Sequence, residues 1–244
     1  TKAARVVYAA RGDGIMEFGL RRAQGPDAGI YGARAALIGG CIGTSNVLTG
    51  KMFGVPVKGT HAHSWIMSFP DEYTAFKTYA ELYPNACILL VDTYDVLDSG
   101  VPNAIRVFKE MKEKDPGFKN YGIRIDSGDL AYLSKEAYKM LDAAGFGDAV
   151  ISASSDLDEY LIDSLKAQGA KINSWGVGTN LFTSKDCPAF GGVYKLAAIK
   201  DQEDAEFIPK IKLSENSEKV TNPGNKTIFR IYDKATGKIR ADLI

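Results

Sequence analysis

The chain has 244 residues, of which 45% are hydrophobic and 25% are charged, as expected for one large α/β domain or two small domains. Its 30 lysines and arginines equal its 30 aspartates and glutamates, so the formal net charge is zero. No overall field attracts nucleic acid, and any anion site must be built locally. This balance favours a small charged ligand.

No apolar run reaches the roughly eighteen residues of a membrane span, and the first residues lack the apolar block of a signal peptide. We therefore expect a cytoplasmic protein with no membrane partner. The chain lacks an initiator methionine, which suggests a fragment. Cys41, Cys87 and Cys187 are far apart, with no Cys-x-x-Cys spacing for a metal or redox pair, so reduced thiols are expected.

Taken in chain order, residues 5–10 (RVVYAA) are typical of the middle of a helix or of a strand. Short apolar runs then predict buried strands at residues 55–57, 88–91, 121–125, 149–152 and 172–177. Apolar residues with a period of 3.6 predict amphipathic helices between them, at residues 103–114, 130–144 and 157–168.

Residues typical of helix starts and ends flank these predicted helices. Pro102 and Asp129 are suited to helix starts, and Gly145 and Gly169 to helix ends. Strand and helix alternate at about thirty residues per unit, which is the βαβ pattern and requires parallel strands with covered faces. The sequence therefore predicts a parallel α/β barrel or a doubly wound sheet over residues 1–193.

The character of the chain changes after residue 193. Residues 193–199, 207–213 and 227–232 alternate like strands, with no helical segment between them and turn residues at 223–226 and 235–238. Residues 194–244 are therefore predicted to form an antiparallel β segment of a second domain, most of which is absent.

His63 follows Gly59 by four residues and precedes an apolar helical run, so its ring is expected near the positive end of a helix. That field favours a neutral, nucleophilic nitrogen and stabilises a bound phosphoryl group, which suits a phosphohistidine. The alternative is a histidine that only caps the helix. His61 is expected to be structural.

Asp92 ends a predicted strand and is expected on the same rim as His63. Its carboxylate would orient the imidazole through the nitrogen that does not react. Asp95 and Asp98 are alternatives for this role, and a loop aspartate that caps a turn explains the position equally well.

Arg124 and Asp126 share one face at the end of another predicted strand. Because burying such charges is costly, the pair is expected to meet either a substrate or each other as an internal salt bridge. Arginine grips carboxylates and phosphates, while Asp126 can accept ribose hydroxyls or help to hold Mg²⁺. Asp129 is predicted to cap the next helix.

Two weaker patterns complete the candidates. Gly178 and Thr179 end the last parallel strand in a layout that exposes backbone N–H groups to a phosphate, although such a sequence is usually a turn. Phe18 and Arg21 could stack on a heterocycle and bind an anion, although a core aromatic followed by solvated arginines is the commoner meaning.

Six blocks of the sequence resemble the nicotinate phosphoribosyltransferase family, in that family's order across most of residues 14–232. They are EFGLRRAQGPD at 17–27, GTSNV at 43–47, GTHAHS at 59–64, LVDTYD at 90–95, RIDSGD at 124–129 and GVGT at 176–179. The resemblance implies an irregular α/β barrel of the type II phosphoribosyltransferase kind, beside a domain built from both chain ends. It also implies a homodimer at full length.

The activity implied by the resemblance joins nicotinate to phosphoribosyl pyrophosphate and is driven by ATP through a phosphohistidine, with Mg²⁺ accompanying ATP and phosphoribosyl pyrophosphate. The resemblance also implies roles for individual residues. His63 is phosphorylated, and Asp92 orients it. Nicotinate contacts Thr60 and Arg124 and stacks on Phe18, while Thr179 binds the substrate phosphate and Arg21 and Asp126 serve the phosphoribosyl group.

The chain departs from the family pattern at two places. Ser155 stands where asparagine is expected in a Ser-Asn-Asp sequence. The family's amino-terminal segment, with a tyrosine that covers the nicotinate ring across a dimer interface, is missing from the sequence. We therefore expect the isolated chain to retain much of the site but to be inactive alone.

Three alternatives remain open. A nicotinamide or quinolinate phosphoribosyltransferase would differ in the charge of its pyridine substrate, and Ser45, which is not an acid, favours a carboxylate substrate. An inactive phosphate-binding barrel fragment would carry no phosphate on His63. An aldolase-like barrel would form an imine on Lys58 or Lys195.

Overall fold

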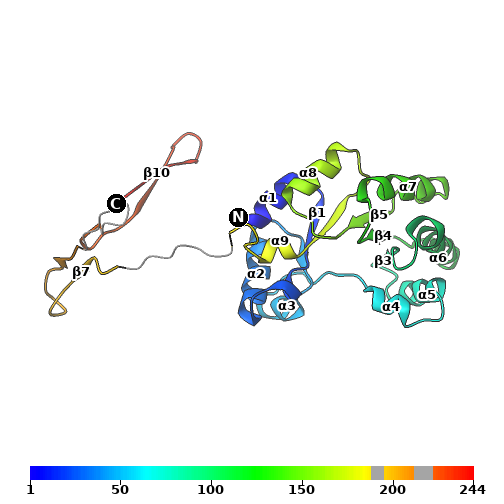
Figure 1. The fold of residues 1–244 in the computed structure, drawn as a ribbon, viewed down its shortest axis with the longest axis horizontal. Coiled ribbons are helices and arrows are strands. Elements are labelled where there is room, and N and C mark those ends of the chain that lie inside the picture. Colours follow the sequence, from blue (N-terminus) through cyan, green and yellow to red (C-terminus); the bar gives the residue numbers. More distant parts are fainter. Residues whose placement is uncertain (188–194, 212–221) are drawn as a thin grey trace. The chain divides into compact units, whose positions relative to one another are not determined.

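The computed structural model describes residues 1–187, 195–211 and 222–244. The chain divides into two compact units, Thr1–Pro188 and Ala189–Ile244 (Figure 1). Each unit is described below by itself.

The first unit is built on a sheet of six parallel strands in the order β2-β1-β6-β5-β4-β3. The strands are β1 Gly14–Glu17, β2 Gly43–Thr44, β3 Cys87–Leu90, β4 Tyr121–Ile125, β5 Val150–Ala153 and β6 Ser174–Val177. The sheet curls into a half-barrel with helices around its outer side (Figure 1). This confirms the expected parallel α/β barrel class.

Helices make the crossovers that parallel neighbours require. They are α1 Lys2–Ala9, α2 Pro26–Ile38, α3 Val47–Phe53, α4 His63–Met67, α5 Glu72–Leu82, α6 Val101–Lys114, α7 Leu130–Ala143, α8 Glu159–Ala167 and α9 Thr179–Phe182, with a short 3₁₀ helix η1 at Leu20–Arg22 and a π-helix η2 at Val96–Gly100. The largest fully buried side chains, Trp175, Phe76 and Phe108 among them, fill the core of this unit.

The predicted helices begin and end near the capping residues that the sequence predicts. Asp129 caps α7 by accepting a hydrogen bond from the Tyr132 N–H at 3.0 Å, as predicted. Gly145 and Gly169 follow α7 and α8 with φ values of 87° and 73°, a region that favours glycine. The three predicted helices are therefore confirmed to within two residues at each end.

The strand predicted at residues 55–57 is wrong. Only Val57 forms an isolated bridge, with Thr44 of β2. The Thr44 N–H donates to the Pro56 carbonyl at 3.0 Å, and the Lys58 N–H donates to the Thr44 carbonyl at 2.9 Å. Proline has no N–H with which to extend the ladder, so the segment borders β2 without becoming a strand.

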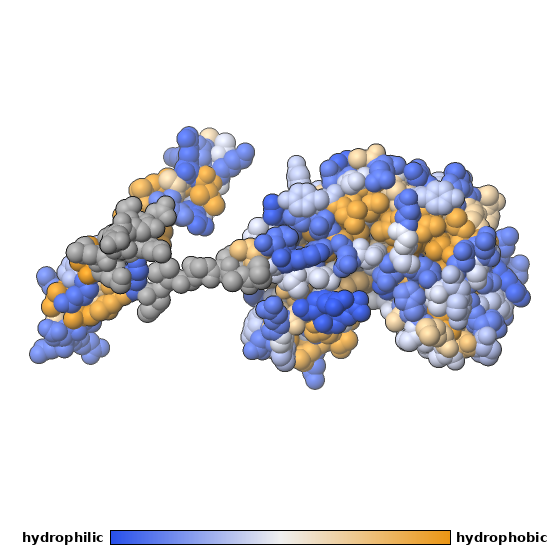
Figure 2. All heavy atoms as spheres, in the orientation of Figure 1, coloured by the Kyte–Doolittle hydropathy of each residue, from blue (hydrophilic) through white to orange (hydrophobic). Residues whose placement is uncertain are grey.

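The second unit contains antiparallel strands, as expected from the alternating tail. β7 Ala198–Ile199 pairs with β8 Ile208–Pro209, and β9 Phe229–Tyr232 pairs with β10 Ile239–Leu243. The beginning of the strand expected from residue 193 and the end of the one expected up to residue 213 lie outside the described residues. Apolar side chains of β9 and β10 remain on the surface of this unit (Figure 2).

The structure also defines the lengths of the described helices and the state of the buried cysteines. Within the described residues no helix is long and apolar enough to cross a membrane. Cys41 and Cys87 are buried and unbridged, and burial raises the pKa of each thiol to about 12, with Glu17 adding to the effect at Cys41. Both thiols therefore stay protonated at neutral pH.

His61 has the structural role expected for it. Its Nε2 accepts a hydrogen bond from the Leu90 N–H of β3 at 3.2 Å, and its ring packs edge-on against Tyr79 with centroids 4.6 Å apart. Burial lowers the pKa of His61 to about 4, so the ring is neutral at pH 7.

This buried histidine predicts a pH dependence of stability. As the pH falls from 6.5 to about 4, the unfolded chain takes up a proton on His61 that the folded chain does not. The free energy of unfolding is therefore expected to drop by up to about 3 kcal/mol over this window because of this group.

Urea unfolding of the wild type and His61→Gln at several pH values measures the effect, because glutamine keeps an acceptor but does not titrate. Ser164→Ala, on the exposed face of α8, is the control and should keep the full pH dependence. Equal slopes for the wild type and His61→Gln would contradict the assignment.

Candidate active site

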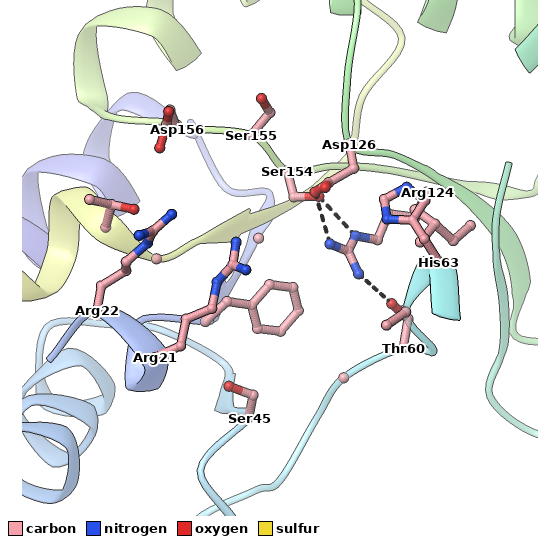
Figure 3. A pocket seen from close by; sticks show the side chains of 17 residues that line it. Arg21, Arg22, Ser45, Thr60, His63, Arg124, Asp126, Ser154, Ser155 and Asp156 are labelled. Atoms are coloured by element: carbon pink, nitrogen blue, oxygen red, sulfur yellow. Dashed lines mark hydrogen bonds and ion pairs between the residues drawn. The ribbon is translucent and has the colours of Figure 1, made fainter. Parts of the chain in front are cut away.

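The parallel register brings the carboxyl ends of the strands to one rim. Leu90 pairs with Arg124, Ile125 with Ala153, and Glu17 with both Val177 and Thr44. A cavity of about 540 Å³ opens at this rim (Figure 3). Its lining contains Phe18, Arg21, Arg22, Ser45, Gly59, Thr60, Ala62, His63, Leu90, Arg124, Asp126, Ser154, Ser155, Asp156, Gly176, Gly178 and Thr179. The sequence candidates are therefore gathered in one place, except Asp92, which lies directly behind His63.

The loop after β1 is held by a buried carboxyl group. Glu17 is fully buried and accepts hydrogen bonds from the Gly19 N–H and the Thr44 hydroxyl. Burial raises the pKa of Glu17, an effect that these two donors oppose. Glu17 thus ties the loop of Phe18 to the end of β2, next to Ser45.

Phe18 sits against the floor of the cavity. A Cβ on Gly176 would lie 2.5 Å from the Phe18 ring, so only glycine admits the ring at this depth. The guanidinium carbon of Arg124 lies 5.5 Å from the centre of the same ring, within cation–π range. An aromatic face and a cation therefore adjoin one another at the cavity wall.

Arg124 is anchored by three different segments. Its Nε donates to Ser154 Oγ, its Nη1 to Thr60 Oγ1 and its Nη2 to Asp126 Oδ1, each at 2.8 Å (Figure 3). The internal salt bridge weighed as an alternative is therefore formed, with the Arg124 side chain only 15% exposed. A guanidinium has five N–H groups, so one on Nη1 and one on Nη2 remain for a ligand.

Arg21 and Arg22 differ sharply from Arg124. Both lie on η1, are exposed, and line the cavity (Figure 3). Neither side chain forms a hydrogen bond or ion pair with any residue in the described part of the chain. They supply unneutralised positive charge, which suits a phosphate or pyrophosphate.

His63 and Asp92 form a direct pair. His63 Nε2 lies 3.1 Å from Asp92 Oδ1, with side-chain exposures of 40% and 2% respectively. His63 is the first residue of α4, whose N-cap is Ala62, and it makes no capping hydrogen bond, so the capping alternative is not supported. The alternative partner Asp95 instead accepts from the N–H groups of Leu97 and Asp98 at the start of η2.

The loop after β5 has an unusual backbone. Ser155 and Asp156 have φ values of 104° and 41°, and the buried Asn180 of α9 donates to the carbonyls of Asp156 and Leu157 at 2.9 and 3.0 Å. Non-glycine residues rarely adopt such φ values, although asparagine does so more readily than serine. The Ser155 departure from the family pattern therefore falls at a left-handed position.

Several residues of this site were not predicted from the sequence. Ser154 links Arg124 to Asp126, Arg22 stands beside Arg21, Glu17 anchors the loop of Phe18, and Ser127 donates to Asp92 Oδ2 at 2.5 Å. A polar residue at or just after a buried strand was the available signal in most of these cases. Lys58, considered for an imine, is exposed and not among the residues lining the cavity, and Lys195 belongs to the second unit.

Comparisons with known proteins agree with this geometry. Residues 14–234 match the model of the nicotinate phosphoribosyltransferase (NAPRTase) family. The chain is 56% identical to nicotinate phosphoribosyltransferase of Bacillus subtilis (strain 168) over 244 residues, which is 100% of this chain and 49% of that protein. It is 34% identical to the human nicotinate phosphoribosyltransferase over 270 residues, covering 89% of this chain and 49% of the human protein.

Solved structures give the same result. The crystal structure of human nicotinic acid phosphoribosyltransferase matches with a TM-score of 0.78 and 31% identity, over 98% of this chain and 53% of that one. Nicotinate-nucleotide pyrophosphorylase from Pyrococcus furiosus matches with a TM-score of 0.61 and 28% identity, over 74% of this chain and 45% of that one. The chain spans about half the length of these relatives. The family match over most of its residues shows that the chain belongs to the nicotinate phosphoribosyltransferase family.

Proposed function

We propose that the chain carries the reaction site of a nicotinate phosphoribosyltransferase, which forms nicotinate mononucleotide and pyrophosphate from nicotinate and phosphoribosyl pyrophosphate with ATP hydrolysis. The observation that carries the proposal is the convergence on one cavity of a histidine paired with a carboxylate, an anchored arginine beside an aromatic ring, and two unpartnered arginines. The family relationship supports the same reaction.

His63 is proposed as the phosphoryl acceptor. Asp92 occupies Nε2, so Nδ1 is the ring nitrogen left for attack on the terminal phosphorus of ATP. The Nδ1–phosphorus bond would form as the bond to the leaving ADP breaks, and Asp92 would stabilise the positive charge that the ring develops. Asp92 thus acts as the orienting acid.

This assignment predicts an acid-labile phosphate on Nδ1 of His63 after incubation with ATP and Mg²⁺. Intact-mass analysis should show one added phosphoryl group in the wild type and none in His63→Ala, and NMR of the phosphohistidine identifies the nitrogen. His61→Gln, which changes the other histidine, should still be phosphorylated. A phosphate that persists in His63→Ala would contradict the assignment.

Nicotinate is proposed to bind where Phe18 and Arg124 adjoin one another at the cavity wall. The ring would stack on Phe18, and the carboxylate would accept the two remaining N–H groups of Arg124. Thr60 and Ser45 border the same cavity, and neither brings a negative charge that would repel a carboxylate. Nicotinamide lacks the charge, and quinolinate would require a second cation.

Replacing Arg124 by lysine is expected to weaken nicotinate binding by about tenfold or more, since lysine cannot make the paired hydrogen bonds. Binding of neutral nicotinamide should change less, so discrimination between the two falls. Calorimetric competition with both ligands measures this, and Arg5→Lys, at the surface ion pair with Glu159, is the control. An equal loss for both ligands would contradict the carboxylate contact.

The phosphoribosyl pyrophosphate site is proposed to use Arg21 for phosphate charge, Asp126 for ribose hydroxyls, and Gly178 and Thr179 for the 5′-phosphate. The described residues contain no cluster of three side chains that would hold a metal alone. Asp126 and Asp156 are the carboxylates that line the cavity, a donor set that fits Mg²⁺ carried in by phosphates. When bound, the ion would neutralise charge on the leaving pyrophosphate.

Complete turnover is proposed to need more than this chain. The chain covers about half of its relatives, and the hairpin of β9 and β10 has exposed apolar side chains, so residues 194–244 are proposed to belong to a second domain. A homodimer and a cytoplasmic location, both expected from the sequence, remain proposals.

We accordingly expect the 244-residue chain to form nicotinate mononucleotide at least about a hundredfold more slowly than the full-length Bacillus subtilis relative. The chain covers 49% of that relative, and the rest of such a protein is proposed to help orient the substrates. Product formation followed by chromatography measures the two rates. Turnover close to that of the relative would show that these residues suffice.

A further inference from the structure

Asp92 is fixed by more than its histidine. Its Oδ1 faces His63, while its Oδ2 accepts two hydrogen bonds, from the Asp126 N–H at 3.1 Å and from Ser127 Oγ at 2.5 Å. Only 2% of the Asp92 side chain is exposed, so these partners surround both of its oxygens. A carboxylate held on both oxygens has one orientation available to it.

Ser127 sits in a turn that is rigid on both sides. The Asp126 side chain before it is bonded to Arg124, and Asp129 after it caps α7. Gly128 between them has a φ of 79°, the left-handed region that favours glycine. The Ser127 hydroxyl is therefore presented to Asp92 by a fixed loop.

Ser127 does not line the substrate cavity, unlike its neighbour Asp126. Its hydroxyl contacts Asp92, and Asp92 contacts the imidazole of His63. The influence of Ser127 on the reaction thus passes through Asp92 and involves no contact with nicotinate or phosphoribosyl pyrophosphate at the proposed positions.

We propose that Ser127 is a positioning residue for His63: by holding Oδ2 of Asp92, it aims Oδ1 at Nε2 and leaves Nδ1 directed to the phosphoryl donor. The proposal rests on the function proposed above, in which His63 accepts the phosphoryl group. Loss of the hydroxyl leaves Oδ2 with only the longer of its two hydrogen bonds, from the Asp126 N–H, so the carboxylate is held less firmly. Small misplacements of a reacting group cost as much as a hundredfold in rate.

The first test measures the rate of His63 phosphorylation by ATP and Mg²⁺ in single-turnover, quenched reactions of the 244-residue chain. Ser127→Ala is expected to slow phosphorylation by about tenfold or more, with unchanged nicotinate affinity, because positioning affects the reacting atoms and not substrate binding. Ser127→Thr keeps the hydroxyl and should restore most of the rate. Ser164→Ala, on the exposed face of α8, is the matched control.

The second test does not depend on ATP. In ligand-free protein labelled with ¹⁵N-histidine, the Nε2–H proton of His63 should give a downfield resonance protected from exchange by its bond to Asp92. Ser127→Ala should broaden or shift this resonance, and Ser127→Thr should return it.

The two tests separate the possible failures. If the wild type takes up no phosphate, the proposed function fails, while the resonance still decides the role of Ser127. If Ser127→Ala keeps both the wild-type rate and the wild-type resonance, the positioning role is overturned. A loss of rate that Ser127→Thr does not restore, with nicotinate affinity lost as well, would also overturn it, since that pattern indicates a collapsed loop.

Discussion

The anchoring of Arg124 is the interaction on which the rest of the cavity depends. A cation that is only 15% exposed needs acceptors, and those it finds come from the segment before α4, the loop after β4 and the end of β5. These contacts belong to a ring of interactions. Thr60 precedes His63 by three residues, His63 pairs with Asp92, and Asp92 accepts a hydrogen bond from the Asp126 N–H. Each member therefore limits the freedom of the others.

The arginines of the cavity divide into two kinds. Arg124 has most of its hydrogen-bonding capacity committed to protein and offers a fork of fixed direction, which suits a planar carboxylate. Arg21 and Arg22 lie on a short 3₁₀ helix and are exposed, so they can follow a polyanion as its charge shifts during reaction. The anchored arginine suits a small aromatic acid, and the two exposed arginines suit a flexible phosphate ester.

Much of the barrel was predictable because its central strands are apolar runs bounded by clear helix signals. Residues 121–125 and the capped helix from Leu130 are examples, since periodicity and punctuation agree there. β2 was not predicted because it has only two residues, and β1 because its four residues begin with a glycine and end with a glutamate. Their identity as strands comes from pairing with β6 and with each other, which no local pattern reveals.

In the site, too, local sequence patterns predicted some residues, and contacts between distant parts of the chain determine the others. The ends of predicted strands brought Asp92, Arg124 and Asp126 to one rim, because a parallel sheet brings its carboxyl ends together. His63 was placed by its helix start, since the strand predicted before it did not form. Sequence spacing did not decide whether Asp92 or Asp95 pairs with His63. The answer depends on the π-helix, because Asp95 caps its start. The side-chain contacts of Glu17 with Thr44, of Ser127 with Asp92 and of Ser154 with Asp126 span 27 to 35 positions, and such contacts are set by the whole sheet.

The left-handed backbone at Ser155 and Asp156 has a price in folding free energy, on the order of 1–3 kcal/mol for each such residue. Asparagine or glycine at position 155 would relieve part of it, because both adopt positive φ more readily than serine. These two residues directly follow Ser154, which accepts a hydrogen bond from Arg124, so the strained backbone adjoins the anchored arginine. Among relatives of this protein, heat tolerance and the residue at this one position should vary together.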